Sequence, residues 1–179
     1  MKVMATIRST MIFCVISPLF FSQTTGNRSV AVTLPVVTLM DIEPAGTISM
    51  NFTAPTEAGL PLTAPAANTT KWINYSSAIA PAGLTRRITA SVNQTIPGVN
   101  ILLQAAAASG AGGGTLGTPT AQVTLSTTAV NIITGIGGAF TGNGNTNGHR
   151  LTISLAISNY ANLSTITNTP VIITYTITE

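Results

Sequence analysis

The chain has 179 residues and a formal net charge of +3, and only 6% of its residues are charged, against about a quarter in an average globular domain. Hydrophobic residues make up 45% of the chain, which excludes a highly charged disordered protein because enough apolar surface is present to offset the entropy of folding. With one histidine, one cysteine and four acidic residues, the chain is poor in the side chains that catalysis and metal binding require. We therefore expect no enzyme, no cofactor and no metal site.

Residues 1–22 have the pattern of a secretory signal peptide. Lys2 and Arg8 give a positively charged start, and residues 11–21 form a short apolar stretch that ends next to the small Ser22. An apolar stretch of about 11 residues is too short to cross a bilayer, so we expect no transmembrane segment in the mature chain.

We predict that this leader is removed between Ser22 and Gln23, which leaves a single mature domain of residues 23–179. Cleavage removes Cys14, the only cysteine, so the mature domain has no disulfide and depends on its hydrophobic core. It also removes two of the seven basic residues, and the nearly balanced charge that remains gives no reason to expect nucleic-acid binding. The protein is thus predicted to be secreted to the periplasm, the cell surface or the extracellular space.

Alternation of apolar with small or polar residues, the pattern of a half-buried β-strand, recurs along the mature chain. Threonine fills many of the alternate positions, which suits the solvated face of a sheet, and Gly, Pro and Asn separate the segments. About eight or nine such strands predict a single antiparallel β-sandwich, immunoglobulin-like or jelly-roll. The alternating segments, in chain order, are residues 30–42, 48–52, 88–92, 99–105, 123–125, 151–157 and 171–177.

The only tryptophan, Trp72, lies close to Tyr75 in the sequence. A buried tryptophan on a central strand is the more common arrangement in a β-sandwich. If the two rings are exposed instead, they can stack on a sugar. The alternative function is therefore a secreted carbohydrate-binding or adhesive module that uses Trp72 and Tyr75 together with the glycine-rich segments 109–117 and 142–148. We expect both glycine-rich segments to be flexible loops between strands.

Few other side chains offer chemistry. His149 is the only histidine, and its position between a Gly/Asn-rich turn and a predicted strand indicates an exposed strand-edge residue rather than a catalytic base. Asp41 and Glu43 share one face of a strand, where they either bind a cation together or, as we prefer, form a solvated strand end. An enzyme with a sparse carboxylate site is the third hypothesis. Arg86 and Arg87 are interpreted as strand-edge charges that discourage mispairing.

Residues 170–179 give the clearest alternation, in which Val171, Ile173, Tyr175 and Ile177 alternate mostly with threonines. Together with the leader and the Thr/Asn/Gly-rich, cysteine-free mature domain, this segment resembles the fimbrial subunits (pilins) and spore-coat-U-like secreted β-sandwich proteins of bacteria. The resemblance implies a surface polymer or coat in which one subunit donates a strand to the next. We therefore expect a secreted, non-catalytic structural or surface protein whose partners are its own copies or related surface subunits, with a glycan as the alternative partner.

The first alternating segment is the predicted assembly strand. Val30, Val32, Leu34 and Val36 share one face, and Pro35 removes one main-chain hydrogen-bond donor. Proline inside a strand is typical of an edge or exchangeable strand. Because a segment from another subunit can satisfy an open sheet edge with main-chain bonds, we expect this segment to be the donor.

Overall fold

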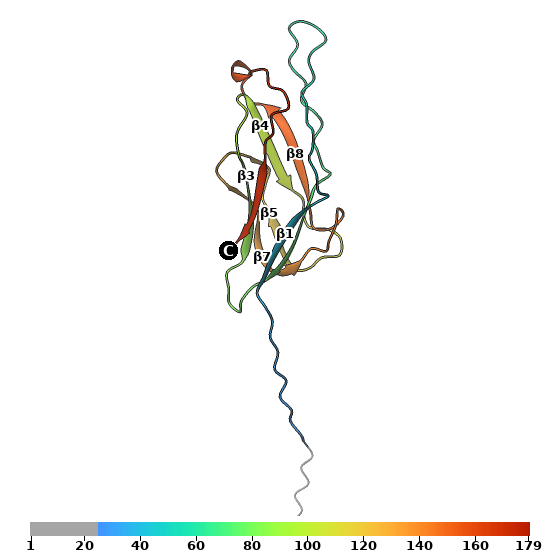
Figure 1. The fold of residues 1–179 in the computed structure, drawn as a ribbon, viewed down its shortest axis with the longest axis vertical. Helices are drawn as coiled ribbons and strands as arrows, with labels where there is room; N and C mark the ends of the chain where they lie inside the picture. Colours follow the sequence, from blue (N-terminus) through green and yellow to red (C-terminus); the bar gives the residue numbers. More distant parts are fainter. Residues whose placement is uncertain (1–24) are drawn as a thin grey trace, which may run out of the picture. The chain divides into compact units, whose positions relative to one another are not determined.

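The computed structural model describes residues 25–179, so the predicted signal peptide and its cleavage site at Ser22 and Gln23 lie outside the described residues. The described part contains nine β-strands, one short 3-10 helix and no α-helix, which confirms the predicted all-β class and number of strands (Figure 1). The elements are β1 (Val37–Glu43), β2 (Trp72–Ala78), β3 (Arg86–Val92), β4 (Val99–Ala105), β5 (Gly113–Pro119), β6 (Val123–Thr124), β7 (Val130–Phe140), β8 (His149–Ile157), η1 (Tyr160–Asn162) and β9 (Ile173–Thr178).

All strand pairs are antiparallel, and the strands follow the order β6-β4-β8-β2-β7-β3-β9, with β1 beside β2 and β5 beside β7. Strand β2 joins the two halves of this sheet, because Trp72 and Ile73 pair with β8 while Ser76 and Ser77 pair with β7. The hydrogen bonds therefore run through one continuous sheet. An immunoglobulin-like or jelly-roll sandwich stays a prediction.

One hydrophobic core serves both halves of the sheet, because its buried side chains come from strands on either side of β2. They occupy alternate positions of β3, β4 and β8, as a strand with one buried face requires. The alternation predicted for residues 88–92, 99–105 and 151–157 is therefore confirmed. The largest fully buried apolar side chains are Ile73, Ile88, Leu103, Ile132, Ile133, Ile136 and Leu151.

Two alternating segments do not form strands. Residues 30–36 have no regular structure, and the first strand begins only at Val37. Residues 48–52 likewise form no ladder, and the nearest pairing is the isolated bridge between Thr53 and Thr63. Alternation determines which face of a strand is apolar, but a strand forms only beside another strand to which its backbone can bond. Neither segment is bonded to such a neighbour in the described residues.

The prediction that residues 109–117 form a flexible loop is wrong, because strand β5 begins at Gly113 and pairs with β7. Gly114 has a φ of +85°, and a Cβ there would lie 2.2 Å from the Gly138 carbonyl oxygen. The glycines thus allow close strand pairing with a register shift, a role that composition alone does not distinguish from a loop.

Candidate functional site

An apolar groove of about 1150 Å³ lies between β9 and residues 46–54, floored by side chains of β4 and β8. We refer to it as the apolar groove. Its volume is slightly above the range of small-molecule cavities, about 300–1000 Å³, whereas close-packed cores leave few voids larger than a water molecule. Apolar side chains that line it include Ile48, Met50, Phe52, Leu155, Val171 and Ile173.

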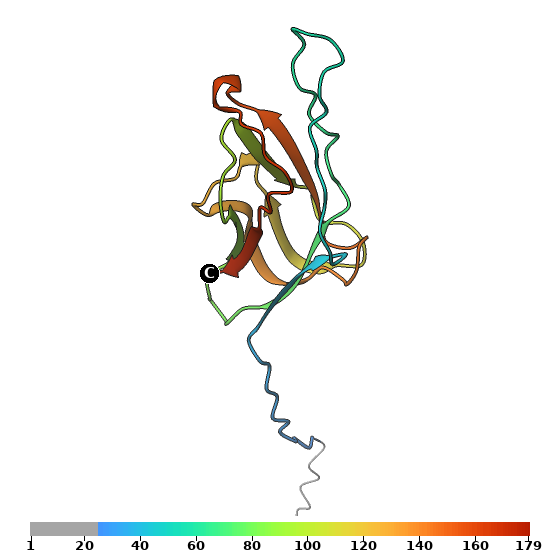
Figure 2. The same ribbon diagram turned by 45° about the horizontal axis from the view of Figure 1, so that its top comes forward.

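Strand β9 forms one border of the groove and has a free edge. It pairs only with β3, beside which it lies in Figure 2. The backbone N–H of Asn93 donates to the Ile172 carbonyl oxygen over 3.1 Å, which places the main-chain groups of Ile172 on the β3 side. Because these groups alternate along a strand, those of Ile173 and Tyr175 point to the unpaired edge. Their side chains are half-buried and line the groove, so the predicted alternation is confirmed but the side chains border a cavity.

Residues 47–52 form the opposite border. Ile48 and Met50 are half-buried and pack against the core, while Thr47, Ser49 and Asn51 are exposed. Within the part of the chain that the structure describes, no backbone N–H or C=O of residues 47–52 has a hydrogen-bond partner. One free strand edge, that of β9, and one irregular segment with unpaired main-chain groups, residues 47–52, therefore border the same apolar groove. Unpaired main-chain groups beside apolar side chains are what an added strand can bond to.

Lys71 fixes the start of this second border. Its side chain is buried, and its Nζ donates to the carbonyl oxygens of Pro44 at 2.6 Å and Gly46 at 2.7 Å. These bonds hold the turn that leads from β1 into residues 47–52. The lysine therefore stabilises the border although that border has no strand partner.

The predicted assembly strand is exposed. Val30, Val32, Leu34 and Val36 are 82%, 74%, 86% and 64% accessible to solvent, and residues 25–36 belong to no strand. Four large apolar side chains at alternate positions are costly to leave in water, since burying each contributes about 1.5–3 kcal/mol. The segment thus has the side-chain pattern of a strand and, within the described residues, no sheet to join.

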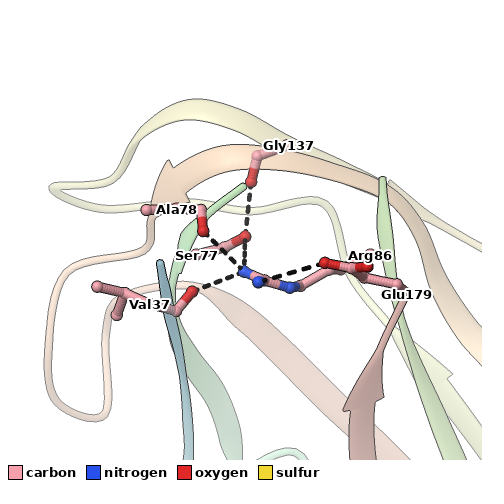
Figure 3. Close-up of polar contacts among 6 residues, drawn as sticks. All are labelled: Val37, Ser77, Ala78, Arg86, Gly137 and Glu179. Carbon is pink, nitrogen blue, oxygen red and sulfur yellow. Dashed lines mark hydrogen bonds and ion pairs between the residues drawn. The ribbon is translucent and has the colours of Figure 1, made fainter. Parts of the chain in front are cut away.

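Arg86 is buried, with 3% exposure, so its interpretation as a strand-edge charge is wrong. Its Nη1 donates to the Val37 carbonyl oxygen at 2.6 Å and to Ser77 Oγ at 2.9 Å, and its Nη2 lies 3.6 Å from Glu179 Oε1 (Figure 3). Ser77 Oγ in turn donates to the carbonyl oxygen of Gly137 on β7. One guanidinium therefore ties the first residue of β1, where the exposed segment joins the sheet, to β2 and to the end of β9.

His149 is fully buried, so its assignment to an exposed strand edge is wrong. Its Nδ1 lies 2.8 Å from the Ala106 carbonyl oxygen, and its Nε2 lies 3.0 Å from the Tyr75 hydroxyl, which also hydrogen-bonds the Leu116 carbonyl oxygen. The two rings stack with centroids 5.8 Å apart. Tyr75 is 3% exposed, so its ring has no free face on which a sugar could stack, and Trp72 is half-buried. The ligand contact at these two residues stays a prediction.

Burial lowers the pKa of His149 from its ordinary value near 6.5, and the hydrogen bonds to Ala106 and Leu116 oppose this only in part. The unfolded chain therefore binds a proton at a higher pH than the folded domain. We expect the free energy of unfolding to be highest above pH 6.5 and to fall as the pH drops through and below that value.

Urea titrations from pH 7.5 to pH 5 measure this dependence, with His149→Gln as the variant that cannot titrate. The slope between pH 7 and pH 5 should be smaller in His149→Gln than in the unmodified domain. If the domain instead becomes more stable as the pH falls through this range, the folded domain binds the protonated form of His149 more tightly than the unfolded chain does, which would contradict this prediction.

In residues 25–179, no group of three or more His, Cys, Asp and Glu side chains lies close enough together to hold a metal ion. Asp41 is exposed, and its Oδ1 accepts a hydrogen bond from the Ile42 N–H at 2.7 Å. Glu43 is half-buried at the end of β1. In the same residues, no helix is long and apolar enough to span a membrane.

Comparisons with protein-family models, with curated proteins and with solved structures find no match. The fold and the site define an all-β domain with an open apolar groove, a free edge on strand β9 and exposed apolar side chains at alternate positions ahead of its first strand.

Proposed function

We propose that this protein is a secreted, non-catalytic structural subunit that assembles at a cell surface by β-strand addition. The donor is the segment of residues 30–36 of one copy, and the acceptor is the apolar groove of the next copy. The observation that carries the proposal is the apolar groove, which has the free edge of strand β9 on one side and the unpaired main-chain groups of residues 47–52 on the other. The resemblance of residues 170–179 to the closing strand of fimbrial subunits supports the same function.

The donor and the groove match in length and in pattern. Residues 30–36 carry four large apolar side chains in seven residues, and β9 with the two residues before it carries four at the same spacing. Three of these four, Val171, Ile173 and Tyr175, line the groove. At about 3.3 Å per residue, each segment spans roughly 20 Å. Thr33 and the other small residues of the donor then face away from the groove, as on the outer face of β9.

The free energy gained by burying the donor side chains and the free-energy cost of association are of similar size. Four buried apolar side chains contribute on the order of 6–12 kcal/mol, and association costs about 4–15 kcal/mol in lost translational and rotational freedom. Main-chain hydrogen bonds to both borders of the groove, each worth about 0.5–1.5 kcal/mol, therefore decide whether the complex forms. Pro35 contributes no N–H to these bonds, which a donor between two borders tolerates at one position.

Deleting Gln23–Pro35 is expected to abolish polymers and leave a soluble, β-rich domain. Negative-stain microscopy and sedimentation velocity measure the assembly state, and circular dichroism measures the fold. The matched controls are a chain with Val30, Val32 and Leu34 replaced by serine, which should also fail to assemble, and a chain with Ala31 and Thr33 replaced by serine, which should still assemble.

Polymers from the truncated chain would contradict the proposal. So would an intact chain that stays monomeric at high concentration while a truncated chain fails to fold, because the segment would then be an ordinary part of its own domain.

A further inference from the structure

A second hollow, of about 390 Å³, lies on the outer face of β1, β2 and β7, away from the residues that line the apolar groove. Leu39 on β1 pairs with Ser76 on β2, and Ser76 pairs with Phe140 on β7. The small serine thus forms a floor between two large apolar walls. Leu39 is 66% exposed and Phe140 is 54% exposed, so neither wall is covered by the domain itself.

The Phe140 ring is held in place from one side. It lies beside Gly113 on β5, where a Cβ would come within 3.1 Å of the ring carbon Cε1. Any larger residue at 113 would displace the ring. The glycine therefore leaves room for the Phe140 ring beside β5, and the ring keeps an exposed surface on which a ligand can stack.

Polar groups stand at one end of the same hollow. Asp41 is the next outward residue of β1 after Leu39, and it is exposed. Its Oδ1 already accepts the Ile42 N–H, which leaves Oδ2 free to accept further hydrogen bonds. Asn143, in the loop that follows β7, is exposed and also lines the hollow, and its side chain carries an amide.

The loop that carries Asn143 is fixed by Asn74 on β2. The Asn74 Oδ1 accepts from the Gly144 N–H at 2.8 Å, and its Nδ2 donates to the Asn147 carbonyl oxygen at 2.7 Å. The Asn147 Nδ2 closes the loop by donating to the Asn143 carbonyl oxygen. The polar end of the hollow is therefore preorganised, which lowers the entropy cost of binding.

We propose that this hollow binds one pyranose ring of a glycan. The apolar C–H face of the sugar stacks on Phe140 and contacts Leu39, and adjacent hydroxyls donate to the Asp41 carboxylate and bond the Asn143 amide. The volume is near the lower end of the range for small-molecule sites, which suits a single ring. This site does not depend on strand addition. The sugar stacks on the exposed ring of Phe140 and does not need the buried ring of Tyr75.

The test is a titration of the exported domain with methyl glycosides of glucose, galactose, mannose and N-acetylglucosamine, followed by ¹H–¹⁵N NMR shifts. At least one glycoside should give saturable shifts at Ser76, Phe140 and Asn143. Phe140→Ala and the isosteric Asp41→Asn should each weaken binding at least about tenfold. Leu60→Ala, which removes an exposed apolar side chain elsewhere, should leave binding unchanged.

Absence of saturable shifts with all four glycosides would overturn the proposal. Saturable shifts of unchanged affinity in both Phe140→Ala and Asp41→Asn would also overturn it. If Phe140→Ala fails to fold, the affinity of Asp41→Asn alone decides. Shifts at this hollow caused by a peptide of residues 30–36, and by no glycoside, would assign it to contacts between subunits instead.

Discussion

Replacing Arg86 by methionine is expected to lower the free energy of unfolding by about 2–4 kcal/mol, because hydrogen bonds from a charged donor to buried acceptors are lost. The Val37 carbonyl oxygen and Ser77 Oγ would lose their guanidinium donor in the interior. The ion pair with Glu179 adds little, since that carboxylate is 53% exposed and screened by water. Urea unfolding measures the change.

The neighbouring Arg87→Met is the matched control. Arg87 is exposed on the outer face of β3, and its replacement should change stability by no more than about 0.5 kcal/mol. Equal stability of Arg86→Met and the unmodified domain would show that the cost of burying the guanidinium cancels its hydrogen bonds.

Replacing Ile173 by aspartate is expected to weaken assembly by at least about a hundredfold, since an incoming strand would have to bury a carboxylate among apolar side chains. Ile173 is half-buried and borders the apolar groove, so the isolated domain keeps its fold with a solvated carboxylate. Sedimentation velocity over a range of concentrations measures the association. Thr174→Asp, on the exposed face of the same strand, should assemble normally.

Equal loss of assembly in Ile173→Asp and Thr174→Asp would contradict the role of the groove face. Normal assembly of Ile173→Asp would show that the groove is not the acceptor.

The alternating pattern predicted the faces of the strands better than it predicted their neighbours. In β8, Leu151 and Ile153 were placed on the buried face from their spacing alone, and the structure confirms this. His149 lies on the same face of β8 as both residues, so the alternation also indicates that this histidine is buried. Its polarity and the preceding turn favoured the surface, but hydrogen bonds to the Ala106 carbonyl oxygen and Tyr75 make its burial tolerable.

Arg86 shows the same effect on β3, where it is in phase with the buried Ile88 and Ala90. A charged side chain is placed inside only when partners from distant strands are available, and Val37 and Ser77 are not visible as partners in the local sequence. The groove could not be predicted for a related reason. Residues 48–52 alternate as a strand does, and local spacing does not reveal that their edge has no neighbour.

Intermolecular disulfide formation tests the central claim, strand addition into the apolar groove, most directly. A chain that begins at Gln23 has no cysteine, so one chain can carry a single cysteine in the donor and another a single cysteine at Ile173. Donor cysteines at Val30, Val32, Leu34 and Val36 are mixed in turn with the Ile173→Cys chain, and Thr33→Cys, on the opposite face, is the control. We expect a mixed disulfide dimer with at least one of the four inward positions and none with Thr33→Cys. No mixed dimer from any inward position, or equal yield from Thr33→Cys, would contradict it.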